Sequence, residues 1–393
     1  MGDDISHAAK SHEISRGTFH INRNSGIHEL RILWVYPIAL LFYLFGVNDF
    51  SAALYPLICD LGSIVLIFYI GRLLLDWRVG LLSAFLLSFF PLHVVYSGQT
   101  TPDTVLAFFS ALGVYLFIKA ENININKHRY YLLSGIVWGL GYLVKETNLI
   151  LGLFFMAYII FKTAKDRRIN KGYALVFMGF LLIFTVEGFY NYLQTGDFLL
   201  RLHSSCRVNE HFDNNPQQDV IASLRAFFPP LEGSFKIILS VLPPSINTFL
   251  EFNQPPFAEF GYFYYFIVIA SVYMLVKHIK SSYVFLLWIA VLFLYLQLGP
   301  MSLNLEHYVL ITKLNRYFSI ITIPSLLILA YFLLINWSDQ NPNTVVRHTR
   351  KILSERQNFV SHRKNCFAIG KIPKDFCKQR AEGSFLFLLA KIL

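Results

Sequence analysis

The sequence predicts an all-α polytopic membrane protein. Of its 393 residues, 55% are hydrophobic, 17% aromatic and only 15% charged, which is too apolar for a soluble domain of this length. Long apolar runs recur along the chain, several of them close to the ~20 residues that cross a bilayer as a helix. Lysine and arginine gather in the short connections between these runs. Most of the chain is therefore expected to lie in lipid.

About nine apolar segments are expected to form helices. The hairpin around the polar turn Ser97 to Pro102 is the clearest of them, and Asp103 is the only acidic residue between Gly80 and Lys119. In order, the segments are Ala52 to Gly71, Val79 to Ser97, Thr101 to Lys119, Tyr130 to Val144, Asn148 to Phe161, Tyr173 to Tyr190, Phe260 to Val276, Tyr283 to Gly299 and Phe318 to Ile335.

Every second connection is basic, and the positive-inside rule places these connections in the cytoplasm. They contain Arg72 and Arg78; Lys119, Lys127 and Arg129; Lys162, Lys165, Arg167, Arg168 and Lys171; and Lys277 and Lys280. This distribution accounts for the net charge of +10 through membrane topology, so no nucleic-acid partner is expected. The expected location is a cell membrane.

Alternation places the remaining connections on the extracytoplasmic side. They hold Asp103, the Lys145 and Glu146 turn, a long loop over 191–259, and residues 300–317. The uncommon polar residues therefore gather at one membrane surface, where a site is expected.

The segment from Leu30 to Val47 is apolar but short and contains Pro37, so it is expected to be re-entrant or interfacial. We divide the chain into a first extracytoplasmic loop with an acidic pair and interfacial helix (1–51), N-terminal transmembrane helices (52–190), an extracytoplasmic loop (191–259), C-terminal transmembrane helices (260–337) and a basic cytoplasmic tail (338–393).

Ordered motifs carry a family resemblance. They are "AAKSHEISRGTF" after an acidic pair, "YPIALLFYLFGVNDFSAALYPLICDLGSIVLIFYIGRLL", "GLLSAFLLSFFPLHVVYSGQTTPDTVLAFFSALGVYLFIKA" and "GIVWGLGYLVKETNLI". In this order they resemble the GT-C glycosyltransferases of the protein-mannosyltransferase and aminoarabinose-transferase type (glycosyltransferase family 39-like). The resemblance implies a GT-C helical bundle. In that family a first transmembrane helix precedes the acidic pair, so the chain resembles a member that begins just after that helix.

The resemblance implies three catalytic candidates. Asp3 and Asp4 match the acidic pair of the first loop, with Asp3 as the general base, and Asp103 matches the acid of the second loop. A carboxylate within reach of an acceptor proton contributes roughly 10²- to 10⁴-fold to the rate. Two acids near a chain end are more often a solvated end, and an acid in the first turn of a helix also complements the macrodipole, so these structural explanations stay open.

Three residues are candidates for binding the phosphate of the donor. Lys145 lies in the lysine-containing turn of the family, and Arg316 with Tyr317 resembles its Arg-Tyr pair before the last core helix. A cation there would stabilise the charge that develops on the leaving phosphate. The alternatives are a snorkelling Lys145 and an Arg316 that contacts a phospholipid headgroup.

Two further polar residues lie inside predicted spans. Asp60 must face the bundle interior or water, and His93 is expected to hydrogen-bond across helices. No metal-ligand spacing occurs, so no metal site and no certain cofactor are predicted. A divalent cation at Asp3, Asp4 and Asp103 stays open.

The implied function is extracytoplasmic transfer, with inversion, of a sugar from a polyprenyl-phosphate donor to a protein, lipid or glycan acceptor, as in protein glycosylation or cell-envelope assembly. The partners are that donor, the acceptor and membrane lipids. Two alternatives remain: a transporter or flippase of polyprenyl-linked sugars, although no internal repeat supports it, and an inactive truncated paralogue.

Overall fold

The structure is a computed structural model that describes residues 3–123, 125–210, 262–298, 317 and 319–340. Every regular element within these ranges is a helix. Residues 1–333 form one compact unit, and of the second unit, 334–393, only the end of the last helix is described. The expected all-α fold is confirmed for the described ranges.

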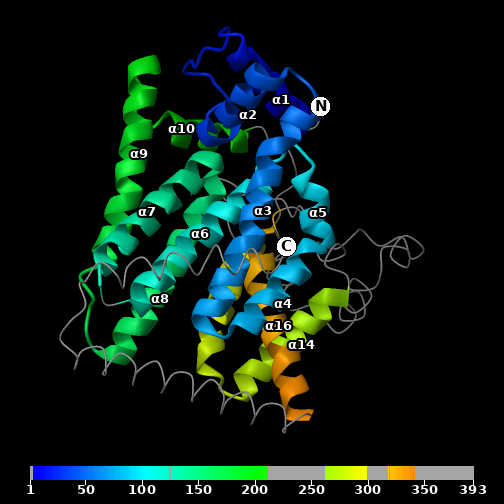
Figure 1. Cartoon of the computed structure of the whole chain (residues 1–393). Helices are drawn as coiled ribbons and strands as arrows, with labels where there is room; N and C mark the ends of the chain where they lie inside the picture. The colour runs from blue at the N-terminus through cyan, green and yellow to red at the C-terminus, as the bar shows by residue number, and fades with distance from the viewer. Residues whose placement is uncertain (1–2, 124, 211–261, 299–316, 318, 341–393) are drawn as a thin grey trace, which may run out of the picture. The chain divides into compact units, whose positions relative to one another are not determined.

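The helices follow one another in the order that the apolar runs predict (Figure 1). They are α1 (Asp3–Ser15), α2 (Ile32–Phe45), α3 (Asp49–Leu74), α4 (Trp77–Ser88), α5 (Pro91–Ser97), α6 (Asp103–Asn122), α7 (Lys127–Val144), α8 (Ile150–Asp166), α9 (Tyr173–Thr195), α10 (Leu200–Glu210), α14 (Tyr262–Val276), α15 (Tyr283–Leu298) and α16 (Ser319–Gln340), with the 3₁₀ turns η1 (Glu146–Leu149) and η2 (Lys280–Ser282).

Five stretches of the described chain are long and apolar enough to cross a membrane, and a bent helix pair makes a sixth. The five are Asp49–Leu74, Asp103–Asn122, Glu146–Asp166, Tyr173–Thr195 and Ser319–Asn336. The helices α2, α14 and α15 are apolar but shorter. Helices thus occur at all nine predicted positions, and the chain is a multi-pass membrane protein, although not every helix has spanning length.

The expectation of one continuous helix over Val79 to Ser97 is wrong. The segment forms α4 and α5, which meet at an angle of 58°. Pro91 is the first residue of α5, a position that favours proline because the N–H it lacks would have no partner in the helix there. Pro91 therefore suits a helix that starts anew after the break, although Pro56 and Pro324 lie inside the continuous helices α3 and α16.

Close glycine contacts hold α7 against α9. A Cβ on Gly135 would overlap the carbonyl group of Val176, and one on Gly179 would lie 2.5 Å from the carbonyl oxygen of Leu132. Small residues let helix backbones approach each other closely in a bilayer, where burial from water does not drive helices together. These glycines set the distance between the two helices that end beside the site.

Three helices, α1, α2 and α10, lie at the end of the bundle where α3 and α6 begin and where α7 and α9 finish (Figure 1). The short helix α2 ends before Gly46, and Asn48 then caps α3 through a hydrogen bond from the Ser51 N–H of 2.9 Å. The segment is thus a short apolar helix at the bundle end, and its interfacial or re-entrant position stays a prediction.

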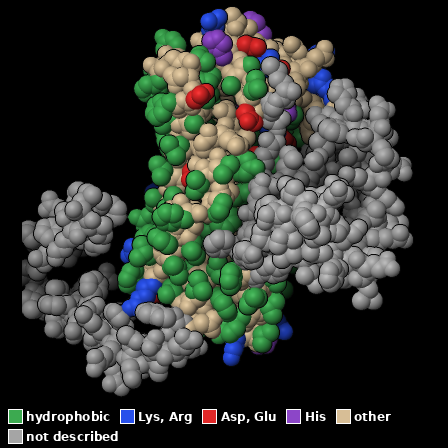
Figure 2. All heavy atoms as spheres, turned by 90° about the vertical axis from the view of Figure 1, so that its right-hand side faces the viewer, with side chains coloured by type: hydrophobic (Ala, Val, Ile, Leu, Met, Phe, Trp, Pro, Cys, Tyr) green, Lys and Arg blue, Asp and Glu red, His purple; other side chains and the backbone are tan. Residues whose placement is uncertain are grey.

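The charged side chains lie toward the two ends of the bundle. Figure 2 shows a hydrophobic surface between one end that carries acidic, histidine and basic side chains and an opposite end with lysine and arginine. The apolar side chains exposed on α3, α4 and α5 include Ile58, Leu61, Phe85 and Val94. A hydrophobic band bounded by polar ends is the surface expected of a chain solvated by lipid tails.

Candidate functional site

A buried ion pair joins the first residue of α6 to the turn after α7, at the end of the bundle where α1, α2 and α10 lie. Lys145 Nζ donates a hydrogen bond of 2.6 Å to Asp103 Oδ1. Both residues are almost inaccessible, with 3% and 1% of their surfaces exposed. Burial of two charges costs solvation free energy that the mutual attraction must offset, so such a pair inside a membrane helix bundle is a candidate for function.

Tyr317 completes this cluster. Lys145 Nζ lies 4.0 Å from the centroid of the Tyr317 ring, which is within the range of a cation-π interaction. The hydroxyl of Ser319 donates a bond of 3.4 Å to the backbone oxygen of Asp103. The beginning of α16 therefore lies beside the beginning of α6, and the structure brings together three of the six predicted site residues.

Hydrogen bonds to α6 and α7 hold the turn that carries Lys145 in place. Lys145 N–H bonds to Gly141 O at 3.0 Å and ends α7. The Asn148 side chain accepts a bond of 2.8 Å from Ser110 of α6 and donates one of 2.8 Å to Trp138 O of α7. A turn held by bonds to two helices keeps its backbone in place, which is a requirement for a charge that must meet a ligand at a fixed position.

A chain of alternating charges continues from the turn. Arg31 donates two bonds to Glu146, of 2.7 Å and 3.3 Å, the bidentate geometry that a guanidinium and a carboxylate favour. Arg201 lies 3.7 Å from the same carboxylate and donates a bond of 2.8 Å to Glu187. Its guanidinium group also lies 4.4 Å from the ring centroid of Tyr142.

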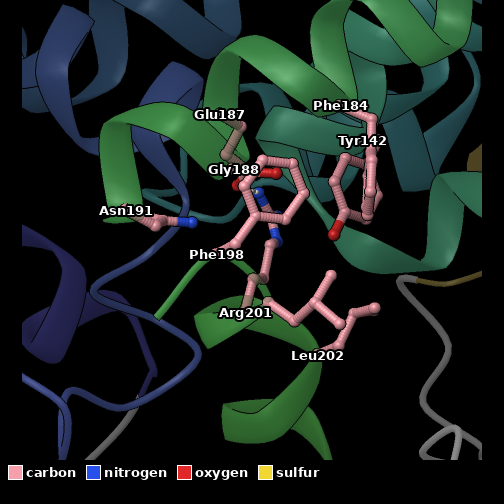
Figure 3. A pocket seen from close by; sticks show the side chains of 9 residues that line it. Tyr142, Phe184, Glu187, Gly188, Asn191, Phe198, Arg201 and Leu202 are labelled. Atoms are coloured by element: carbon pink, nitrogen blue, oxygen red, sulfur yellow. Dashed lines mark hydrogen bonds and ion pairs between the residues drawn. The ribbon is translucent and has the colours of Figure 1, made fainter. Parts of the chain in front are cut away.

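Figure 3 shows Arg201 reaching from α10 toward Glu187 of α9, with the Tyr142 ring alongside. The pocket between them has no room for a water molecule, so it is a packed seam and not a substrate cavity. Burial alone would lower the pKa of Arg201, but the carboxylates of Glu187 and Glu146 raise it above its ordinary value. Arg201 therefore stays charged, and it joins α9 and α10 to the turn.

The first-loop candidates lie on α1. Asp3 and Asp4 form its first turn, and Asp4 is exposed; the description of side chains begins with Asp4. Further along α1, His7 Nε2 lies 3.4 Å from Arg31 Nη1. Because a guanidinium only donates, that ring nitrogen of His7 must accept. Through Arg31 and Glu146, α1 is thus joined to the turn of Lys145, at the same end of the bundle.

One candidate, Arg316, lies outside the described residues. The described part of the chain also contains no group of three or more His, Cys, Asp or Glu side chains that could hold a metal ion. Asp60 and His93 form a pair that the sequence analysis did not predict: Asp60 is buried, and its Oδ1 lies 2.7 Å from His93 Nδ1, a hydrogen bond between two helices. This bond joins α3 to α5.

The sequence analysis gave no site role to Arg31, Glu146 or Arg201, although it placed Glu146 in the same turn as Lys145. Each occurs as a charge within or beside an apolar run: "ELRILW", "LVKETN" and "FLLRLHSS". All three are charges in apolar stretches at the predicted membrane surface that also holds Asp103. This feature could have identified them as site residues. Their partners are far apart in the chain, so the pairing itself required the fold.

Part of the chain matches a known protein family. Residues 32–188 match the family of dolichyl-phosphate-mannose-protein mannosyltransferases. This stretch covers α2 to most of α9, and so includes Asp103 and Lys145. A comparison with curated proteins found no match.

Two solved structures share the fold. ArnT from Cupriavidus metallidurans bound to undecaprenyl phosphate superposes with a TM-score of 0.58 at 16% identity, over 90% of this chain and 60% of that one. The archaeal oligosaccharyltransferase AglB from Archaeoglobus fulgidus, in complex with an inhibitory peptide and a dolichol-phosphate, gives 0.55 at 14% identity, over 88% and 48%.

The fold is therefore that of the GT-C membrane glycosyltransferases, as the motifs predicted. Within that class the chain resembles the protein mannosyltransferases and aminoarabinose transferases. It spans about half to three fifths of the length of the two solved structures.

Proposed function

We propose that the chain transfers a sugar from a polyprenyl-phosphate donor to an acceptor on the extracytoplasmic side of the membrane. The observation that carries the proposal is the buried Lys145, paired with Asp103 and facing Tyr317 at the end of a bundle with the GT-C fold. A lysine fixed in a dry site is a strong partner for a phosphate. The likeness to proteins that bind polyprenyl phosphates supports the choice of donor.

The chemistry is a single displacement. The acceptor hydroxyl or amine attacks the anomeric carbon, and its proton passes to a carboxylate, for which Asp3 is the candidate. The bond from that carbon to the phosphate oxygen breaks as the new bond forms, so the configuration inverts and the electron pair leaves with the phosphate. Lys145, with Arg316 and Tyr317, stabilises this leaving group.

Asp103 has two roles in this scheme. Its carboxylate lies 2.6 Å from Lys145 Nζ and orients the lysine. When the donor phosphate binds, Lys145 contacts both anions, and Asp103 also orients the acceptor. The Asp103 carboxylate is thereby both an orienting group for Lys145 and a catalytic candidate.

A transfer assay tests the proposal. The purified full chain in lipid nanodiscs is given polyprenyl-phosphate mannose or polyprenyl-phosphate aminoarabinose with a membrane extract as the acceptor source, and released polyprenyl phosphate is measured. Release is expected for the parent and for Glu13→Gln, a change of another acid on α1, and none for Asp3→Asn. Equal release from both variants would overturn Asp3 as the base. Movement of donors across liposome bilayers with no release from any donor would favour the transport alternative.

Sidedness is tested separately. In a background without the native cysteines, Gly2→Cys is expected to react with a membrane-impermeant thiol reagent in intact cells. Lys171→Cys, at the opposite end of the bundle, serves as the matched control and is expected to react only after permeabilisation. The reverse pattern would place the candidate site in the cytoplasm and contradict the proposed topology.

A further inference from the structure

The turn that carries Lys145 is held on two sides. Asn148 fixes it to α6 and α7. On the side that faces α1, α2 and α10, the ion-pair contacts of the turn are those of Glu146 with two arginines. Lys145 and Glu146 are adjacent, so a shift of the Glu146 carboxylate moves the backbone from which Lys145 extends.

Arg201 connects Glu146, and with it the turn, to other parts of the fold. It is 2% exposed, and its Nη1 donates to Glu187 at 2.8 Å and to the backbone oxygen of Leu30 at 3.3 Å. Its Nη2 lies 3.7 Å from Glu146. One guanidinium thus contacts α9, the segment before α2, and the turn.

The charges of this network balance. Ion pairs join three cations, Arg31, Lys145 and Arg201, to three carboxylates, Asp103, Glu146 and Glu187. Because five of these six groups are buried and Glu146 is only partly exposed, removal of one charge leaves a partner poorly compensated in a medium of low dielectric constant, and the others must rearrange. Loss of Arg201 would leave Glu146 paired with Arg31 alone, and Arg31 also contacts His7 and His28.

We propose that Arg201 is a positioning residue for the donor site: through Glu146 it holds the turn so that Lys145 meets the donor phosphate. The proposal rests on the proposed function, because it assumes that Lys145 binds that phosphate. It predicts that α10, through Arg201, sets the affinity of the site for a polyprenyl phosphate.

A binding measurement tests the link. Affinity for undecaprenyl phosphate and for dolichyl phosphate is measured on the purified full chain in nanodiscs, for the parent, Arg201→Gln and Arg201→Lys. Coupled residues change a binding constant by about tenfold, which is the loss expected for Arg201→Gln. Arg201→Lys keeps the charge but cannot serve Glu146 and Glu187 together, so a smaller loss is expected. Lys162→Gln removes an exposed ion pair at the opposite end and is expected to change nothing.

The decisive comparison uses a Lys145→Ala background. If Arg201 acts through Lys145, Arg201→Gln has no further effect on affinity there. An equal loss in both backgrounds, or no loss in the parent background, would overturn the inference. If Arg201→Gln does not fold, Glu146→Gln, which keeps the shape of the side chain, is measured in the same cycle and is expected to show the same dependence on Lys145.

Kinetics separate positioning from a general loss of structure. In the transfer assay, Arg201→Gln is expected to raise KM for the donor, with kcat and KM for the acceptor nearly unchanged. A fall in kcat alone would contradict the inference. A parent chain that binds neither polyprenyl phosphate would overturn the proposed function itself, and the inference with it, whereas a binding parent with additive variants would overturn the inference alone.

Discussion

Lys145 and Asp103, which are separated by 42 positions in the chain, form a 2.6 Å ion pair that is closed off from solvent at the end of the helix bundle. The pair joins the turn after α7 to the first residue of α6. It gives both residues a structural role as well as a candidate catalytic one, and the two roles can be separated experimentally.

Removal of one partner should be worse for stability than removal of both. Lys145→Ala removes the cation that neutralises the buried Asp103 carboxylate and is expected to cost about 3 kcal/mol. Lys145→Ala combined with Asp103→Ala removes both charges and should recover much of this loss, without recovery of transfer. Thermal unfolding of the purified variants measures the first effect, and the transfer assay measures the second. A double variant no more stable than Lys145→Ala would show that the pair is not a unit.

The packing of α7 on α9 should not tolerate a methyl group. Gly135→Ala is expected to cost about 2 kcal/mol, because the new Cβ would overlap the Val176 carbonyl group and backbone cannot move aside as a side chain can. Gly113→Ala is the matched control in a helix, since its Cβ would meet Leu151 Cδ2 at 3.4 Å, an ordinary contact. Thermal unfolding measures the loss of stability in the two variants. Equal losses would contradict this expectation.

Asp60 and His93 should behave as one unit. Because a carboxylate oxygen accepts, His93 Nδ1 carries the hydrogen of their 2.7 Å bond. Asp60→Asn and His93→Ala are each expected to lower stability, and the double variant should be hardly worse than either, with a coupling energy of about 1 to 2 kcal/mol. A double-mutant cycle on thermal unfolding measures this coupling. Strictly additive losses would mean that the bond does not hold α5 to α3.

Much of the fold could be predicted from the sequence, because apolar runs of spanning length and the alternation of basic connections are strong signals in membrane proteins. The positions of all the described membrane helices followed from them. The break between α4 and α5 did not, although Pro91 marked it. A hydropathy pattern measures only composition along a segment, and it is insensitive to the loss of one backbone N–H.

The site was predictable to the extent that its residues are isolated charges. Asp103 and Lys145 stand out in apolar surroundings, and the structure pairs them. The Glu146 interaction with Arg31 joins positions 115 residues apart, and no local spacing can indicate such a contact. Arg201 could not be identified for the same reason, because its importance lies in its contacts with α9, the segment before α2, the Lys145 turn and α7.

Photo-crosslinking tests the central claim, that the phosphate of a polyprenyl donor binds at Lys145. An undecaprenyl phosphate analogue with a photoreactive group next to the phosphate is irradiated with the purified full chain, and the labelled peptides are identified by mass spectrometry. Labelling is expected on peptides that contain η1 and the start of α16, and this labelling should be weaker in Lys145→Ala. Labelling confined to the opposite end of the bundle, around Lys162 to Lys171, and unchanged in Lys145→Ala would contradict it.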